Sequence, residues 1–273
     1  MAGKLVVCPT PIGNLGDITP RVQEALRTAD AVACEDTRRA GRLFELLEME
    51  SPPFVSFHEE NEVERAREIA QQIERGAVVA LISDAGTPSI SDPGYRLIRA
   101  CIDRDLEIEV LPGPSAVITA LVASGLPTHR WRFEGWMPRR SGELERVLRS
   151  TETVIAFESP RRLPESLRAL AALAPDRPAA VCRELTKLHE EVARGTLGEL
   201  SRQFREEVRG EIVLVIGPGG AAETPDIGFA VDALRGLVRA GAKPRAAAGV
   251  VAALTGVPAN ELYRHLTGRE PRR

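Results

Sequence analysis

The sequence has few of the residues that mark metal, secreted or membrane proteins. Its four cysteines are scattered without a CxxC pair, which argues against structural zinc and favours free, buried thiols. The four histidines are equally dispersed, so we expect no metal site. No apolar run approaches the roughly 20 residues of a membrane helix. The apolar start of the chain is too short for a signal peptide and predicts a first strand. We expect a cytoplasmic protein without membrane contacts.

Fingerprints of several enzyme classes are also missing. The chain contains neither GxGxxG nor GxxxxGK[ST], and Gly13 to Gly16 supplies only GxxG. No GxSxG elbow is present, and no Ser/His/Asp set can be singled out. A dinucleotide-binding Rossmann site and a P-loop are therefore not supported.

What is present is the composition of a globular protein with an uneven distribution of charge. The 273 residues are 43% hydrophobic and 27% charged, enough for one large domain or two modest ones. The net charge is −3, but residues 232–273 carry eight lysines and arginines against three acids, a net of +5 that leaves −8 for residues 1–231. Such a basic tail suggests a polyanionic partner, although a solvated helical surface is the alternative.

The first half of the chain is organised around residues 78–94. An apolar run at 78–82 predicts a buried strand, and residues 83–94 form a loop with two glycines and two prolines before a helix expected at 95–104. Ordinary connections are about two to six residues long. This one is longer, and its glycines allow a close approach of backbone to ligand, so we interpret it as a functional loop.

Strand and helix patterns alternate along the first half. Thr19 and Pro20 give a helix start, and Gly76 gives a helix end. Expected strands cover 5–8, 31–34, 54–57, 78–82 and 108–111, and expected helices cover 20–29, 62–75, 95–104 and 116–124. Each polar or Gly/Pro cluster follows a strand, the edge where open parallel sheets bind ligands.

The pattern changes after Gly125. Strands are expected at 153–157, 179–182 and 212–216. Helices are expected at 143–148, from after residue 162 to about 173, and at 197–207, and together they indicate a second α/β domain with a mixed sheet. Residues 221–228 are interpreted as a linker. Helices are expected at 232–240, 244–255 and 259–266, the last two with helix–turn–helix spacing around Gly256. Short Ala-rich helix pairs also occur as plain packing units. The predicted domains are 1–114, 115–222 and 223–273.

Several separated motifs resemble the tetrapyrrole methylase superfamily. They are residues 9–17, 34–38, 84–94 and 111–115. Further stretches at 58–61, 158–162 and 183–191 resemble the branch of that superfamily that modifies small-subunit ribosomal RNA. The resemblance covers essentially the whole chain. It implies two α/β domains with S-adenosylmethionine in the cleft between them, a C-terminal helix–turn–helix-like module and a homodimer.

The resemblance also implies a set of cofactor-binding residues. They come from the first loop, the loop at 84–94, the strand end at 111–112 and the second domain, and are Pro11, Asp84, Ala85, Gly86, Ser91, Asp92, Pro112, Ala116, Phe157, Leu185 and Leu214. Glycine- and proline-rich loops expose backbone groups to adenine, and carboxylates or carbonyls favour a cationic sulfonium.

The implied reaction is methylation of the ribose 2′-oxygen of a cytidine in the decoding region. A hydroxyl is a poor nucleophile, so a base or a cation that stabilises the alkoxide is expected. Candidates at the strand ends are Glu35, Asp36, His58, Glu184, Lys187 and His189. Lys187 acts as a base only if its pKa is lowered, and as an ammonium it steadies an oxyanion or phosphate. Strand-end carboxylates also cap helices or pair with arginines, as Asp36 could with Arg38 or Arg39.

Arginine-rich stretches suit phosphate contacts. The RNA-binding candidates are Arg38, Arg39, Arg139, Arg140, Arg161, Arg162, Lys243 and Arg245. Trp131 and Trp136 are candidates to stack an unstacked base, with packing as the alternative. The substrate is then small-subunit rRNA or the subunit itself.

Two other functions compete with this interpretation. One is methylation of a small corrinoid or porphyrin precursor, for which the basic tail has no obvious use. The other is a non-catalytic ribosome assembly factor, against which the density of ligand loops argues.

Overall fold

A computed structural model describes residues 3–219, 227–255 and 257–267. Contacts divide the chain into two compact units, Met1–Val147 with Thr153–Gly217 and Leu148–Glu152 with Pro218–Arg273. Both sheets belong to the first unit. The predicted linker lies outside the described residues up to 226, and so does Gly256 of the predicted turn.

The first sheet is entirely parallel, in the order β3-β2-β4-β1-β5. Its strands are β1 (Lys4–Val7), β2 (Ala31–Cys34), β3 (Phe54–Ser56), β4 (Val78–Leu81) and β5 (Glu107–Val110). Its helices are η1 (Leu15–Asp17), α1 (Pro20–Thr28), α2 (Thr37–Leu46), α3 (Glu62–Glu74) and α4 (Tyr95–Ile102). The parallel α/β prediction is confirmed.

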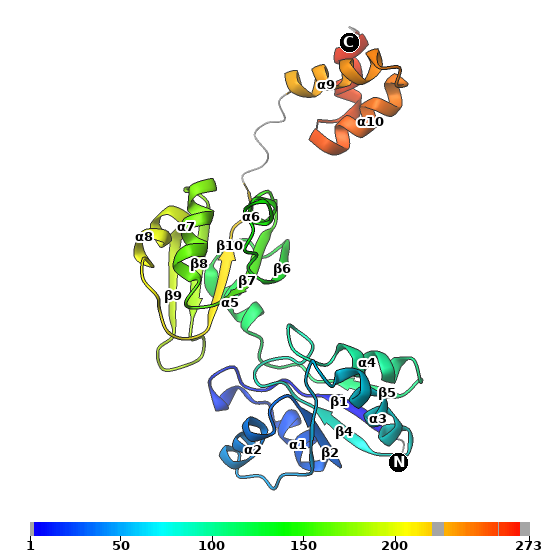
Figure 1. Ribbon diagram of the computed structural model, residues 1–273, viewed down its shortest axis with the longest axis vertical. Coiled ribbons are helices and arrows are strands. Elements are labelled where there is room, and N and C mark those ends of the chain that lie inside the picture. Colours follow the sequence, from blue (N-terminus) through cyan, green and yellow to red (C-terminus); the bar gives the residue numbers. More distant parts are fainter. Residues whose placement is uncertain (1–2, 220–226, 256, 268–273) are drawn as a thin grey trace. The chain divides into compact units, whose positions relative to one another are not determined.

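Alternation along the strands builds a core on each face of this sheet (Figure 1). Val6 and Val32 pack with α1 and α2, whereas Leu5, Val7 and Ala33 pack with α3 and α4. The central strands β1, β2 and β4 are therefore covered on both faces, whereas the edge strands β3 and β5 stay partly exposed.

Helix starts follow the capping signals in the sequence. The Thr19 hydroxyl accepts from the Val22 N–H ahead of Pro20, as predicted. The carboxylate of Asp36 caps α2, a helix that the sequence reading did not include, by accepting from the Arg38 N–H. Ser115 caps α5 (Ala116–Ser124) through the Ile118 N–H.

The second sheet is mixed, as predicted, in the order β6-β7-β10-β8-β9. Only β6 and β7 are parallel partners. The strands are β6 (Trp131–Trp136), β7 (Thr153–Glu158), β8 (Pro178–Arg183), β9 (Glu191–Thr196) and β10 (Ile212–Ile216), with the helices α6 (Ser141–Leu148), α7 (Leu163–Leu173) and α8 (Leu197–Gln203). The outer strands β6 and β9 were not predicted, and α8 ends at Gln203 rather than at Glu207.

The remainder of the described chain is helical. Helices α9 (Ile227–Arg239), α10 (Pro244–Thr255) and α11 (Ala259–Thr267) share one small core that includes Leu234, Val251 and Leu262. In the described part of the chain, no helix is long and apolar enough to span a bilayer.

All four cysteines are buried free thiols without disulfide bonds, as predicted. Burial raises the pKa of Cys34 to about 12, which leaves its thiol protonated and unreactive at neutral pH.

Candidate active site

The loops that follow β1, β4 and β5 are joined to one another by backbone contacts. Thr10 and Gly86 exchange two N–H···O bonds of 2.9 and 3.0 Å. The Thr87 hydroxyl donates to the Pro114 carbonyl at 3.1 Å. A Cβ at Gly113 would meet that of Pro9 at 2.7 Å, so this position requires glycine. The three strand ends form one preorganised loop cluster.

The loop after β4 holds an uncommon backbone conformation. Ser89 and Ser91 have φ of 74° and 64°, in the left-handed region that residues other than glycine seldom occupy. The buried carboxylate of Glu62 anchors the end of the loop by accepting from the N–H groups of Gly94 and Arg96, each at 3.1 Å. Such strain persists where surrounding contacts impose it, and it clusters at functional sites.

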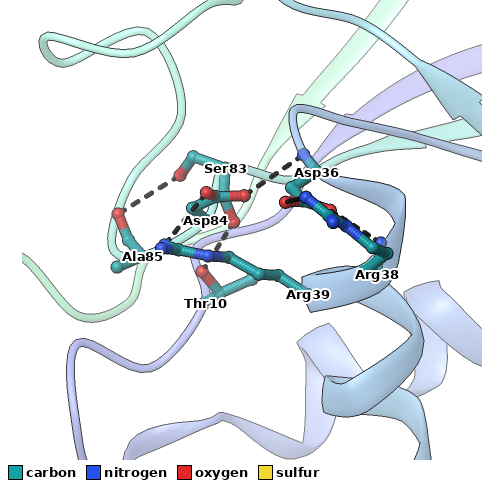
Figure 2. A network of polar contacts seen from close by, with 7 residues as sticks. All are labelled: Thr10, Asp36, Arg38, Arg39, Ser83, Asp84 and Ala85. Atoms are coloured by element: carbon teal, nitrogen blue, oxygen red, sulfur yellow. Dashed lines mark hydrogen bonds and ion pairs between the residues drawn. The ribbon is translucent and has the colours of Figure 1, made fainter.

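Asp84 lies at the centre of an ion-pair network in this cluster (Figure 2). Its carboxylate pairs with Arg39 at 3.0 Å and accepts from the Asp36 N–H at 3.3 Å. Asp36 itself pairs with Arg38 at 3.0 Å, and that hydrogen bonding lowers its pKa to about 2. Asp36 is thus a helix cap and an ion-pair partner, a poor proton acceptor at neutral pH.

The carboxyl groups of Asp92 and Glu35 have raised pKa values, in contrast with that of Asp36. Burial raises the pKa of Asp92 to about 6; the charges of Glu35 and Asp84 add to this, and a hydrogen bond from Ser83 opposes it. Burial, followed by the charge of Asp84, also raises the pKa of Glu35. We call Glu35, Asp84 and Asp92 the acidic group. His58 interacts electrostatically with Glu35 and so belongs to the same surroundings.

A cavity of about 360 Å³, here called the apolar cavity, opens beside Asp92. Residues of both α/β domains line it: Ile12, Ala85, Gly86, Thr87, Ile90, Ser91, Asp92, Ser115, Ala116, Val117, Trp136, Phe157, Glu158, Ser159, Pro160, Gly210, Glu211, Ile212 and Val213. Its volume and its mixture of apolar walls with a few polar groups are typical of small-molecule sites.

The structure gathers some of the predicted cofactor residues here. Those on the wall are Ala85, Gly86, Ser91, Asp92, Ala116 and Phe157. Pro11 and Asp84 line a separate cavity of about 280 Å³ together with Asp36 and Arg39. Pro112 is exposed, whereas Leu185 and Leu214 are buried, and none of these three lines either cavity.

Glu184 and Lys187 form a second polar cluster. The Lys187 ammonium contacts Glu184 at 2.7 Å and Glu211 at 3.1 Å. Burial acts to lower the pKa of Lys187, but the hydrogen bonds to the two glutamates outweigh it and raise the pKa. Lys187 is therefore a fixed ammonium, and Glu211 connects it to the wall of the apolar cavity. His189 is exposed and not on that wall.

A hollow of about 740 Å³ lies next to the apolar cavity, because Trp136 and Ser159 line both. Its other lining residues are Met137, Pro138, Arg139, Arg140, Glu143 and Arg162, and we call it the arginine-lined hollow. Three of the predicted RNA-binding arginines thus meet here.

The other RNA-binding candidates are dispersed. Arg38 and Arg39 pair with carboxylates of the loop cluster, and Arg161 pairs with Glu207 at 3.3 Å. Lys243 and Arg245 are exposed at the start of α10 in the other unit. Trp131 is 38% exposed and lines none of the cavities described, whereas Trp136 is 59% exposed at the shared wall.

Sequence reasoning missed several wall residues, among them Ile12, Ser115 and Ser159. Each was inside a motif that had been singled out, so proximity to a strand end was the available signal. Gly210 to Val213 come from the start of β10 and not from its carboxyl end, because β10 runs antiparallel to its neighbours β7 and β8.

Among the described residues, no group of three or more His, Cys, Asp and Glu side chains is arranged to hold a metal ion.

The family described as tetrapyrrole (corrin/porphyrin) methylases matches residues 4–201.

Named relatives align over nearly the whole chain. "Ribosomal RNA small subunit methyltransferase I" of Micromonospora olivasterospora is 44% identical over 272 residues, covering 97% of this chain and 87% of the relative. The protein of the same name from Escherichia coli O157:H7 is 39% identical over 273 residues, covering 96% and 94%. A solved structure of uroporphyrin-III C-methyl transferase from Thermus thermophilus, complexed with S-adenosylhomocysteine, aligns with a TM-score of 0.55 at 19% identity, covering 79% of this chain and 97% of that one.

Proposed function

Because the chain belongs to the tetrapyrrole methylase family, and within it to the relatives named ribosomal RNA small subunit methyltransferase I, we propose that it methylates small-subunit ribosomal RNA with S-adenosylmethionine. The finer proposal is transfer to the ribose 2′-oxygen of a cytidine in the decoding region of 16S rRNA. The choice of the 2′-oxygen follows from the family resemblance, and the structural observation that supports methylation of an RNA is the juxtaposition of the apolar cavity with the arginine-lined hollow at Trp136. One suits a nucleoside-like cofactor and the other a polyanion.

The residues of the apolar cavity fit this cofactor. Its walls at Ala116, Val117 and Ile212 offer an apolar slot for adenine, and the loop at Ala85–Gly86 exposes backbone groups. Asp92 lines the same cavity and would offer a carboxylate to the cationic sulfonium. When bound, S-adenosylmethionine supplies an electrophilic methyl group.

The chain's own residues then have to position a hydroxyl and accept its proton. Asp92 lines the cavity, and a pKa of about 6 leaves it mostly ionised at neutral pH yet basic enough to take a proton onto its carboxylate. Glu35 provides a neighbouring carboxylate of raised pKa. Lys187 serves as a fixed positive charge toward an oxyanion or phosphate.

Charge favours an RNA substrate over a small tetrapyrrole precursor. Arg139 and Arg140 project cations next to the cavity, and Lys243 and Arg245 add exposed cations on α10. This function places the protein with ribosomes in the cytoplasm, and we expect it to act as a homodimer, which light scattering on the purified chain would check.

The test is incubation of the full chain with labelled S-adenosylmethionine and either naked small-subunit rRNA or assembled small subunits lacking the modification. We expect label in RNA, resistance of the modified position to alkaline cleavage as a 2′-O-methyl mark, and mapping to one cytidine. Label on a base atom, or label in a corrinoid or porphyrin precursor but not in RNA, would overturn the proposal.

A further inference from the structure

The arginine-lined hollow differs from the rest of the site in the state of its charges. In the described part of the chain, the guanidinium groups of Arg139 and Arg140 form no ion pair or hydrogen bond with the protein. Arg38 and Arg39, by contrast, are each paired with an aspartate. Two adjacent cations without internal partners, beside a cavity, suit an external anion such as a phosphate.

The third arginine of the hollow is fixed in place. Arg162 contacts the fully buried carboxylate of Glu158 at 3.4 Å and donates to the Met137 carbonyl at 3.2 Å. Glu158 is held in turn by the Ser159 N–H at 2.7 Å and by the Ser166 hydroxyl. Arg162 therefore shapes the floor of the hollow as a preorganised donor.

Trp136 forms the wall between the hollow and the apolar cavity. Its ring packs edge-on against Phe157, with centroids 5.9 Å apart, and Phe157 packs in the same way against Phe133 at 5.0 Å. The indole nevertheless stays 59% exposed. An aromatic ring that is supported from behind and open in front is a stacking platform for a nucleobase.

Glu143 brings an acceptor into this basic surrounding. It lines the hollow from α6, it is half-buried, and its carboxylate has no hydrogen bond or ion pair among the described residues. A carboxylate accepts from the 4-amino group of cytosine, whereas uracil presents a carbonyl oxygen at that position and is repelled.

We propose that the arginine-lined hollow holds the nucleotide that is methylated, with its base on Trp136, its flanking phosphate on Arg139 and Arg140, and its cytosine amino group donating to Glu143. This places the ribose at the shared wall of Trp136 and Ser159, facing the apolar cavity. The inference rests on the proposed function and deepens it, because it names the residues that choose cytidine.

The experiment compares matched variants of the full chain. Trp136→Ala is set against Trp131→Ala, at the other end of β6 and outside the hollow, and Glu143→Gln against Glu145→Gln on the same helix, also outside it. One readout is cofactor-free binding of a short decoding-region RNA by fluorescence anisotropy, because Trp136 also lines the apolar cavity. The other is the ratio of methylation rates for RNA with cytidine or uridine at the mapped position.

We expect Trp136→Ala to weaken RNA binding about tenfold and Trp136→Phe to restore most of it, since stacking on an aromatic ring is worth a factor of this order. Glu143→Gln should lower the preference for cytidine over uridine about tenfold, with cofactor affinity unchanged. Thermal melting of each variant shows that it is folded.

The outcomes separate this inference from the proposed function. If the wild-type chain methylates a cytidine of small-subunit rRNA but the hollow variants behave like their controls, the nucleotide binds elsewhere and the inference fails alone. If the wild-type chain methylates no RNA, the proposed function has failed. A loss of cytidine preference in Glu145→Gln equal to that in Glu143→Gln would also contradict the assignment of Glu143.

Discussion

The loop cluster of the first sheet and the arginine-lined hollow of the second use the same residue types in opposite ways. Both contain an Arg-Arg doublet close to a strand end. In the loop cluster, Arg38 and Arg39 are neutralised by Asp36 and Asp84, and carboxylates remain in excess. In the hollow, Arg139 and Arg140 have no such partners among the described residues. An Arg-Arg doublet in the sequence therefore does not by itself identify an RNA contact. Whether the fold pairs the two arginines with carboxylates distinguishes a structural doublet from an anion-binding one.

The contrast has a physical consequence for what each region attracts. Partial burial, followed by the charges of neighbouring carboxylates, raises the pKa values of Glu35 and Asp92, so this region favours protons and cations. Unpaired guanidinium groups favour phosphates. The proton-accepting acidic group and the anion-binding arginine-lined hollow are thus separate regions, and Trp136 lies at the boundary between the apolar cavity and the hollow.

The largest effect on activity should come from Asp92→Asn, which removes the proton acceptor of the acidic group. Loss of a general base costs about 100-fold or more in kcat. The wild-type kcat/KM should fall as the pH drops through about 6, where Asp92 of the free enzyme takes up a proton, and the variant should lack this step. A pH–rate profile measures both, and a variant with wild-type kcat would remove Asp92 from the chemistry.

The same substitution should stabilise the fold at high pH. Burial raises the pKa of Asp92 from the ordinary 3.8 to about 6, so its ionisation destabilises the native state increasingly as the pH rises from about 4 to 6. The cost is complete above pH 6 and has barely begun at pH 4. After allowance for partial exposure, Asp92→Asn should gain about 1 kcal/mol at pH 8 and almost nothing at pH 4. Chemical denaturation at the two pH values checks the sign.

The next prediction removes the arginine doublet of the hollow and compares it with two arginines elsewhere on the surface. Arg139→Ala/Arg140→Ala should weaken RNA binding about 30-fold and lower the salt dependence of binding by one to two ions, because two phosphate contacts are lost. Arg27→Ala/Arg65→Ala removes equal charge from exposed surface ion pairs and is the control. Equal losses in the two double variants would mean that only net charge matters.

In the acidic group, Asp84→Ala should reduce S-adenosylmethionine affinity about tenfold. The substitution removes the contacts of Asp84 with Arg39 and with the Asp36 N–H, and these contacts fix the loop after β4. Calorimetric titration measures the affinity. Asp103→Ala, which breaks an exposed pair with Arg99, is the matched control. An unchanged dissociation constant in Asp84→Ala would separate Asp84 from the cofactor site.

The sequence predicted the buried strands of both sheets well, because apolar runs such as those at β4 and β10 are fixed by burial on both faces. It failed at edges. Strand β6 carries charged residues and a bulge at Gly135, with φ of 75°, and β9 mixes Val192 with Arg194, so neither shows a clean apolar alternation. The helix α2 was not predicted, although capping by a strand-end carboxylate such as Asp36, the alternative stated above, marks its start.

The site was predictable to the level of loops and not of side chains. Strand-end position located Ala85, Gly86 and Asp92 on the apolar cavity. Which arginines remain unpaired depends on partners distant in sequence, as Arg39 and Asp84 show. Trp136 is placed to contact a nucleobase because two cavities meet at its ring. No local sequence pattern predicts such a meeting of cavities.

The smallest effect tests whether unpaired cations outside the first unit follow the same rule. Lys243 and Arg245 are exposed at the start of α10, and their charged groups have no ion pair or hydrogen bond among the described residues. Lys243→Ala/Arg245→Ala should weaken RNA binding about fivefold, and less than the hollow doublet, because exposed cations without a cavity are screened by salt. Anisotropy titrations at two salt concentrations make the comparison. A loss larger than that of Arg139→Ala/Arg140→Ala would place the main anion site on the helical unit and reverse the ranking argued from pairing.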